Sequence, residues 1–300
     1  MTKKKTAVPA EKKNTKIGSP EKLPEVVRFI GISLAGGKSD KACVAVLEYY
    51  PENKKLFLSR LFEKIKSDEQ ISADLKIHEL VEQDPSHTEY VAFDIPWRLP
   101  TCITCRLKCP GFENCHEQHI EWMWHHHRER IQKKRPKKLF TPYTQRAIEM
   151  HFLTELEETF NLHHAMGSNS APLLARASFI QRRLTSECIE VYPMLTLWRL
   201  GHTLKLMKSQ LRSYRAAFGG DEARAQFLQS LNESNIAFLY NQDMKQMVEN
   251  SHAFEAFLCG FTAYLKYKGL TEKKPKTFPK GEDWIEFPVK DLKVKDITHG

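Results

Sequence analysis

Three acidic residues lie in apolar parts of the sequence, where a carboxylate can do chemistry. Asp94 directly follows one apolar run, Glu190 interrupts another, and Glu255 lies in a third that is rich in Phe and Ala. Carboxylates at the edge of a sheet can hold hydrated Mg²⁺ or Mn²⁺ together with a substrate phosphate. Two of these positions also have a purely structural explanation, since Asp94 can cap a turn and Glu190 can face solvent. For Glu255 the functional interpretation is stronger, because a carboxylate among apolar side chains is costly unless it is paired or bound to metal.

Four of the seven cysteines are crowded into one short segment, with two, three and five residues between successive thiols. They are Cys102, Cys105, Cys109 and Cys115. Thiolates at this close spacing suit tetrahedral Zn²⁺, and four of them would complete a structural site. The compact spacing also admits an iron–sulfur cluster, and reduced thiols without a ligand are the remaining alternative. We favour zinc because the sequence shows no motif of an electron-transfer partner.

A basic run follows the cysteines. Residues 128–138 contain seven Lys or Arg and a single Glu, a net charge of +6. The basic residues are Arg128, Arg130, Lys133, Lys134, Arg135, Lys137 and Lys138. The whole chain has a formal charge of +9 and residues 1–22 contribute +5, which leaves about −2 for the rest. The run is either a solvated loop or a contact for the phosphate backbone of nucleic acid. Its dense positive charge supports nucleic-acid binding as the alternative to a solvated loop.

The elements that position these residues follow from the apolar pattern. Three strand-like runs separated by short turns, at residues 26–34, 42–50 and 55–62, predict an antiparallel meander. Helical spacing follows at 69–81, and two further strands are expected at 90–93 and 188–192. The later part of the chain is expected to be helical at 197–217, 222–231 and 244–267, with a last extended segment at 284–289. This order predicts an α/β fold, in which a mixed sheet carries helices on its faces.

Composition sets the organisation of the chain. With 41% hydrophobic and 28% charged residues among 300, most of the chain is expected to be globular. Residues 1–24 predict a disordered Lys-rich tail, 25–270 one domain, and 271–300 a C-terminal extension. Residues 101–161 form a Cys/His-rich, basic and partly helical insert within that domain. Because no apolar run approaches the roughly 20 residues of a membrane span and no signal-peptide core is visible, we expect a cytoplasmic protein without a membrane partner.

Four segments together resemble a known family. GISLAGG, VAFDIPWRLP, ECIEVYP and HAFEAFLCGFTA are similar, in the same order, to the motifs of an uncharacterised family of predicted RNase H-like nucleases (domain of unknown function 429). The resemblance covers about residues 28–269, and the predicted order of strands and helices is also that of the ribonuclease H fold. It implies carboxylates that converge on Mg²⁺ or Mn²⁺ and cleave phosphodiester bonds. By this resemblance Asp94, Glu190 and Glu255 occupy acid positions.

The sequence departs from the family pattern at two places. Ser33 replaces the acid of the first strand, and His252 replaces the earlier acid of the helix motif. In two-metal hydrolysis a first-strand acid usually bridges the two ions, and a serine hydroxyl cannot supply that charge. The departures leave two hypotheses: a metal-dependent nuclease with a reduced site, or a non-catalytic nucleic-acid-binding or scaffold relative.

A phosphoryl-transfer or sugar-kinase-like enzyme is a third hypothesis, because related sheets bind ATP. The sequence has no credible phosphate-binding loop to support it. We therefore expect nucleic acid of unknown type as the partner and no small-molecule cofactor.

Overall fold

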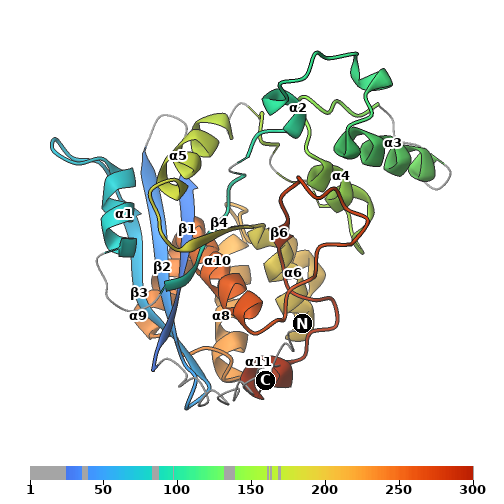
Figure 1. Cartoon of the computed structure of the whole chain (residues 1–300). Coiled ribbons are helices and arrows are strands. Elements are labelled where there is room, and N and C mark those ends of the chain that lie inside the picture. Colours follow the sequence, from blue (N-terminus) through green and yellow to red (C-terminus); the bar gives the residue numbers. More distant parts are fainter. Residues whose placement is uncertain are drawn as a thin grey trace, which may run out of the picture.

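The protein was analysed as a computed structural model, which describes residues 25–35, 40–82, 88–96, 98–131, 139–160, 162, 164–167 and 170–299. At its centre is a six-stranded mixed sheet with the order β3-β2-β1-β4-β5-β6 (Figure 1). The strands are β1 (Val27–Ala35), β2 (Lys41–Tyr50), β3 (Lys55–Ile65), β4 (Thr88–Phe93), β5 (Glu187–Val191) and β6 (Ile285–Glu286). Strand β2 is antiparallel to β1 and β3, whereas β1, β4, β5 and β6 are parallel to one another. The predicted α/β fold, with an antiparallel meander followed by further strands, is confirmed.

Eleven α-helices and one 3₁₀ helix surround the sheet within the described residues. They are α1 (Ala73–Glu82), α2 (Thr101–Thr104), η1 (Phe112–Asn114), α3 (Gln118–Ile131), α4 (Ala147–Thr154), α5 (Ala171–Gln181), α6 (Pro193–Thr203), α7 (Lys208–Arg212), α8 (Gly220–Glu233), α9 (Asn241–Glu249), α10 (Ser251–Tyr267) and α11 (Val294–His299). None of the described helices combines the length and apolarity that crossing a bilayer requires.

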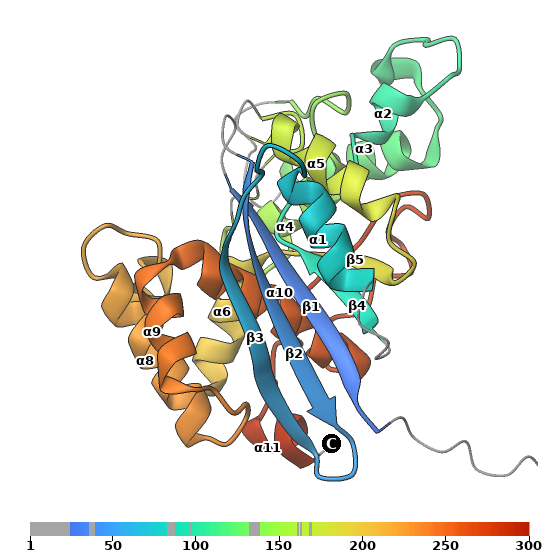
Figure 2. The same cartoon turned by 90° about the vertical axis from the view of Figure 1, so that its left-hand side faces the viewer.

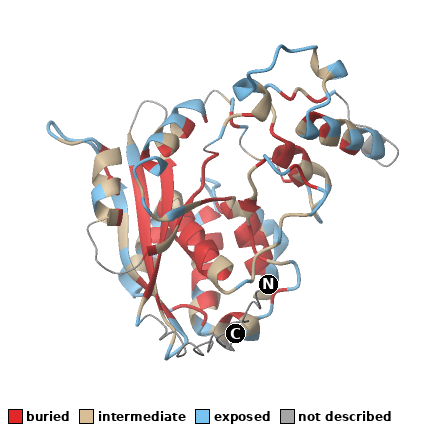
Figure 3. Ribbon diagram, in the orientation of Figure 1, coloured by how far each residue is buried: buried red, intermediate tan, exposed pale blue. Residues whose placement is uncertain are grey.

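Helices cover both faces of the sheet (Figure 2), and an apolar layer lies on each face. On one face, Ile30 and Ile32 of β1 pack with residues of α1 and α5. On the other face, Phe29 of β1 and Leu47 of β2 pack with residues of α6, α8 and α10. Strands β1 and β2 are therefore buried along almost their whole length (Figure 3), which explains why their sequences are apolar runs rather than alternating patterns.

Helix α10 lies directly against the backbone of β1, and glycine makes this possible. A Cβ atom at Gly31 would lie 1.9 Å from the carbonyl oxygen of Ala256 and 2.3 Å from the backbone nitrogen of Gly260. Both contacts are far inside van der Waals distance and involve backbone atoms, so no larger residue fits without moving the helix. The N-terminal turn of α10 is thereby held close to the carboxyl end of β1.

The helical regions differ from the prediction at two places. The helix expected at 244–267 is two helices, α9 and α10, because the side chain of Asn250 accepts hydrogen bonds from the backbone nitrogens of His252 (3.0 Å) and Ala253 (3.4 Å) and starts a new helix. The helix expected at 197–217 is also two, α6 and α7, separated by Lys205 with a φ of 60°. An apolar pattern predicts both regions as helical but does not mark a break between two helices that pack in the same layer.

The predicted tail at 1–24 lies outside the described residues, as do residues 132–138 of the basic run. Residues 271–299 are described, and they extend the sheet: β6 pairs in parallel with β5 inside the extended segment predicted at 284–289. Phe287 of this region is buried in the same apolar layer as α10.

Candidate metal centre

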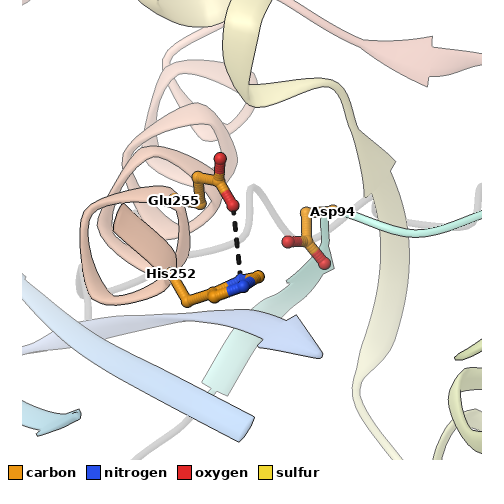
Figure 4. A group of neighbouring side chains, drawn as sticks. All are labelled: Asp94, His252 and Glu255. Atoms are coloured by element: carbon orange, nitrogen blue, oxygen red, sulfur yellow. Dashed lines mark ion pairs between the residues drawn. The ribbon is translucent and has the colours of Figure 1, made fainter. Parts of the chain in front are cut away.

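Three elements meet at the carboxyl ends of β1 and β4. Ser33 lies near the end of β1, Asp94 directly follows β4, and His252 and Glu255 lie in the first turns of α10. The backbone nitrogen of Asp94 donates a hydrogen bond to the carbonyl oxygen of Ile32 (3.3 Å), so the two strand ends are tied together. Figure 4 shows the carboxylate of Asp94 opposite the side chains of the helix. Ligands commonly bind at this edge of open α/β sheets.

Asp94, His252 and Glu255 form a compact group of potential metal ligands. One ligand atom from each residue lies within 4.8 Å of the other two, and no other three His, Cys, Asp or Glu residues in the described part of the chain come so close. Asp94 is 8% exposed and Glu255 is fully buried, whereas the side chain of His252 is 43% exposed. The imidazole is therefore the side of the group that faces solvent.

Ser33 occupies the position where an acid was expected, and its side chain contacts both Asp94 and His252. Its hydroxyl donates a hydrogen bond to Oδ2 of Asp94 (2.5 Å) and lies 3.0 Å from Nδ1 of His252. The backbone nitrogen of Leu34 donates to Oδ1 of Asp94 (3.3 Å). Nδ1 of His252 also faces Oε2 of Glu255 at 3.5 Å. A Ser–His–acid relay needs the hydroxyl and the carboxylate on different ring nitrogens, so this geometry does not support acyl transfer by Ser33.

The two oxygens of Glu255 have different surroundings. Oε1 accepts hydrogen bonds from the hydroxyl of Tyr214 (2.7 Å) and from Nε of Arg215. Oε2 is buried and has no hydrogen-bond partner among the described residues. A buried carboxylate oxygen without a donor is costly, and it faces the ring nitrogen of His252 and the carboxylate of Asp94. A cation between these groups would satisfy it.

The electrostatics of the group also favour a cation. Burial and then the negative charge of Glu255 raise the pKa of Asp94 to about 7, against the opposing effects of the Ser33 hydrogen bond and Arg215. The pKa of Tyr214 is raised by burial and by Glu255. Two buried carboxylates thus share one neighbouring arginine, and the ionised form of Asp94 lacks a full counter-charge.

Glu190 is not brought to this group. Nη1 of Arg146 donates to Oε2 of Glu190 and Nη2 donates to Oε1, both at 2.8 Å. Glu190 alternates along β5 with Ile189 and Val191, which belong to the apolar layer of α10, so its side chain leaves the sheet on the opposite face. Its place beside the other two acids, expected from the family resemblance, is not found. The carboxylate instead belongs to a buried ion pair.

The predicted ligands in the insert lie apart from the acidic group. Cys102 lies in α2, Cys105 ends that helix, Cys109 lies in the following loop, and Cys115 ends η1. All seven cysteines are free thiols. The pKa of Cys102 is raised by burial and by the three neighbouring thiols.

The predicted nucleic-acid contacts are only partly described. The guanidinium of Arg128 in α3 lies over the ring of Trp124, 5.7 Å from its centroid, and Arg130 lies in the same helix. The remaining predicted contacts, Lys133, Lys134, Arg135, Lys137 and Lys138, lie outside the described residues.

Three residues of the site were not predicted from the sequence. His252 could have been included, because its spacing of three from Glu255 places both on one face of a helix. Tyr214 and Arg215 come from the loop between α7 and α8, some 40 residues before Glu255 in the chain. No local pattern in the sequence connects them to the acidic group.

Comparison with known proteins adds one finding. The model of a family described as "Protein of unknown function (DUF429)" matches residues 41–280, which include Asp94, His252 and Glu255. No curated protein and no solved structure matches the chain.

Proposed function

The chain belongs to the DUF429 family of proteins of unknown function, and we propose that it is a divalent-metal-dependent nuclease of RNase H-like type. The observation that carries the proposal is the convergence of Asp94, His252 and Glu255, whose ligand atoms lie within 4.8 Å of one another. Buried carboxylates from separate elements that meet at a strand end are what a hydrolytic metal site requires.

The topology supports the RNase H-like part of the proposal. The order β3-β2-β1-β4-β5, with β2 antiparallel, is the order expected for that fold. The acid after β4 and the acid of the late helix α10 lie on the same end of the sheet, as the family pattern implies. An RNase H-like fold would explain why these two acids, far apart in sequence, meet.

The residues present fit one Mn²⁺ or Mg²⁺ ion. Asp94 and Glu255 would supply carboxylate oxygens, with Oε2 of Glu255 already lacking a donor, and His252 would supply an imidazole nitrogen. Carboxylates suit both ions, and the imidazole favours Mn²⁺ over Mg²⁺. A bound ion would polarise a phosphate oxygen and lower the pKa of a coordinated water.

The surrounding residues have separate tasks in this proposal. Ser33 and the backbone nitrogen of Leu34 hold the carboxylate of Asp94 in place through both of its oxygens. Arg215 neutralises one oxygen of Glu255, and its side chain is 45% exposed, so it can also contact a phosphate at the same edge. Entry from solvent is on the side of His252.

The test is cleavage of labelled RNA, DNA and RNA–DNA hybrid by the purified full chain with Mn²⁺ or Mg²⁺. We expect cleavage that needs the metal and falls to background in Asp94→Ala and Glu255→Gln. The matched control is Glu249→Gln, which removes an exposed glutamate of the adjacent helix α9. Cleavage that survives both site variants would exclude this centre.

One observation favours the second hypothesis, a non-catalytic nucleic-acid-binding relative. Ser33 stands where the family resemblance implies a metal-bridging acid, and its hydroxyl donates a hydrogen bond to Oδ2 of Asp94. Binding of the same labelled nucleic acids without cleavage in any metal would favour that alternative. It would leave Asp94 and Glu255 as remnants of a lost site.

A further inference from the structure

The beginning of the insert is a folded segment without a core of its own. No residue between Thr101 and His119 is buried, and neither α2 nor η1 contributes a buried side chain. The first buried residue after this stretch is Ile120 in α3. Small folded units that bury too little apolar surface are usually stabilised by a disulfide or a metal ion. All seven cysteines are free, so no disulfide fulfils this role.

The segment carries its own set of metal-binding groups. Its four cysteines are free, with Cys102 and Cys115 half-buried and Cys105 and Cys109 exposed. All four lie within fourteen consecutive residues that include most of α2 and all of η1. No three of these sulfur atoms lie within 4.8 Å of one another, so binding of an ion would have to draw its ligands together.

A buried imidazole nitrogen in the same segment has no partner. Nε2 of His119, in the first turn of α3, is buried and makes no hydrogen bond within the described residues. His119 follows Cys115 by four positions, whereas His116 is 90% exposed and pairs with Glu121 instead. Outer-shell groups that hydrogen-bond to metal ligands orient those ligands and tune the affinity for the metal.

We propose that this segment binds one Zn²⁺ through the thiolates of Cys102, Cys105, Cys109 and Cys115, with His119 as a hydrogen-bond donor to one sulfur. Thiolates at 2.3 Å from zinc in a closed tetrahedron form a structural site. The ion ties α2 and η1 to the start of α3. It thereby fixes Phe112, whose ring stacks on Trp124 at 5.8 Å and whose carbonyl oxygen accepts a hydrogen bond from the indole nitrogen (3.1 Å).

The site is independent of the proposed nuclease centre. Its ligands are sulfur atoms and a closed structural site has no open position, whereas the group at Asp94 has oxygen and nitrogen ligands and faces solvent. Loss of zinc is expected to unfold the segment without removing the acidic group. The two proposals can therefore fail separately.

The test is metal analysis of the purified full chain, followed by replacement of zinc with Co²⁺. We expect one zinc ion per chain and, with Co²⁺, the near-ultraviolet charge-transfer bands of thiolate coordination. Cys105→Ser and Cys109→Ser should lose both signals. Cys188→Ser, which removes a half-buried thiol of β5, and Asp94→Ala should keep them.

His119→Ala separates the second part of the proposal. It should retain the thiolate bands and bind zinc about 10- to 100-fold more weakly. Unchanged affinity would remove His119 from the site. Zinc content that is equal in wild type and the Cys105 and Cys109 variants would overturn the proposal, as would acid-labile sulfide with visible absorbance, which identifies an iron–sulfur cluster.

Discussion

Asp94→Asn should stabilise the metal-free protein, and the gain should grow with pH until it is complete at about pH 7. Asp94 is nearly buried, and its pKa is raised from 3.8 to about 7 by burial and by the charge of Glu255. Between these two pH values the folded protein keeps a proton that the unfolded chain has released. The free energy of unfolding therefore falls as pH rises through this window, and above about pH 7 the full penalty is present.

The magnitude follows from that gap in pKa. Each unit corresponds to about 1.36 kcal/mol, so the penalty at about pH 8 is at most roughly 4 kcal/mol. Asparagine removes the charge and keeps the shape, but it weakens the hydrogen bonds from Ser33 (2.5 Å) and from Leu34 (3.3 Å). Losing part of these charge-assisted bonds costs about 1–2 kcal/mol. The net gain in stability should be about 2 kcal/mol at about pH 8, and it should vanish at about pH 4.5.

Urea unfolding in the presence of a chelator measures the change in stability at about pH 8 and at about pH 4.5. Glu249→Gln is the control, and its stability should match that of wild type at each pH. Addition of Mn²⁺ at about pH 8 should stabilise wild type and leave Asp94→Asn unchanged, because ligands stabilise only the state that binds them. An Asp94→Asn protein that is equally destabilised at both pH values would refute the reasoning. It would mean that the carboxylate of Asp94 stabilises the fold as a hydrogen-bond acceptor and that its ionised form is not destabilising.

Two further variants test the framework of the site. Gly31→Ala places a Cβ 1.9 Å from the carbonyl oxygen of Ala256, so it should destabilise the protein by about 3 kcal/mol in urea unfolding and weaken Mn²⁺ binding. The control is Gly281→Ala, whose new Cβ has no atom within 4 Å, and it should change neither the stability nor the Mn²⁺ affinity. Glu190→Gln breaks the buried pair with Arg146 and should cost about 3 kcal/mol in the same measurement. The Mn²⁺ affinity of this variant, measured by calorimetry, should equal that of wild type. A large loss of affinity would show that Glu190 contributes to the metal centre.

The sheet was largely predictable because its signals are local. Strands β1 and β2 are apolar along their length and are separated from β3 by recognisable turn residues, so their order and antiparallel pairing follow from short connections. The position of Asp94 after β4 follows from the same pattern. The break between α9 and α10 was missed because Asn250 acts as a cap only when its side chain turns back to the helix, which the apolar spacing does not reveal.

The site was only half predictable because its partners are distant in sequence. Glu190 and Glu255 look alike in the sequence, as acids within apolar runs. The difference lies in their arginines: Arg146 binds both oxygens of Glu190, whereas Arg215 and Tyr214 bind one oxygen of Glu255 and leave the other without a donor. Which arginine reaches which acid depends on loops and helix packing that no local spacing encodes.

The two departures from the family pattern make sense together. An acid at position 33 would add a third carboxylate beside Asp94 and Glu255, and such a cluster needs the charge of two divalent ions. Ser33 instead donates a hydrogen bond to Asp94, and His252, at a position where the family resemblance implies an acid, would add an uncharged ligand. The two carboxylates carry a charge of −2, which matches one divalent ion, and Arg215 adds a positive charge at the same site. The proposed centre is therefore a one-metal site. In it, Arg215 would stabilise the negative charge of the phosphate, as a second metal ion does in a two-metal site.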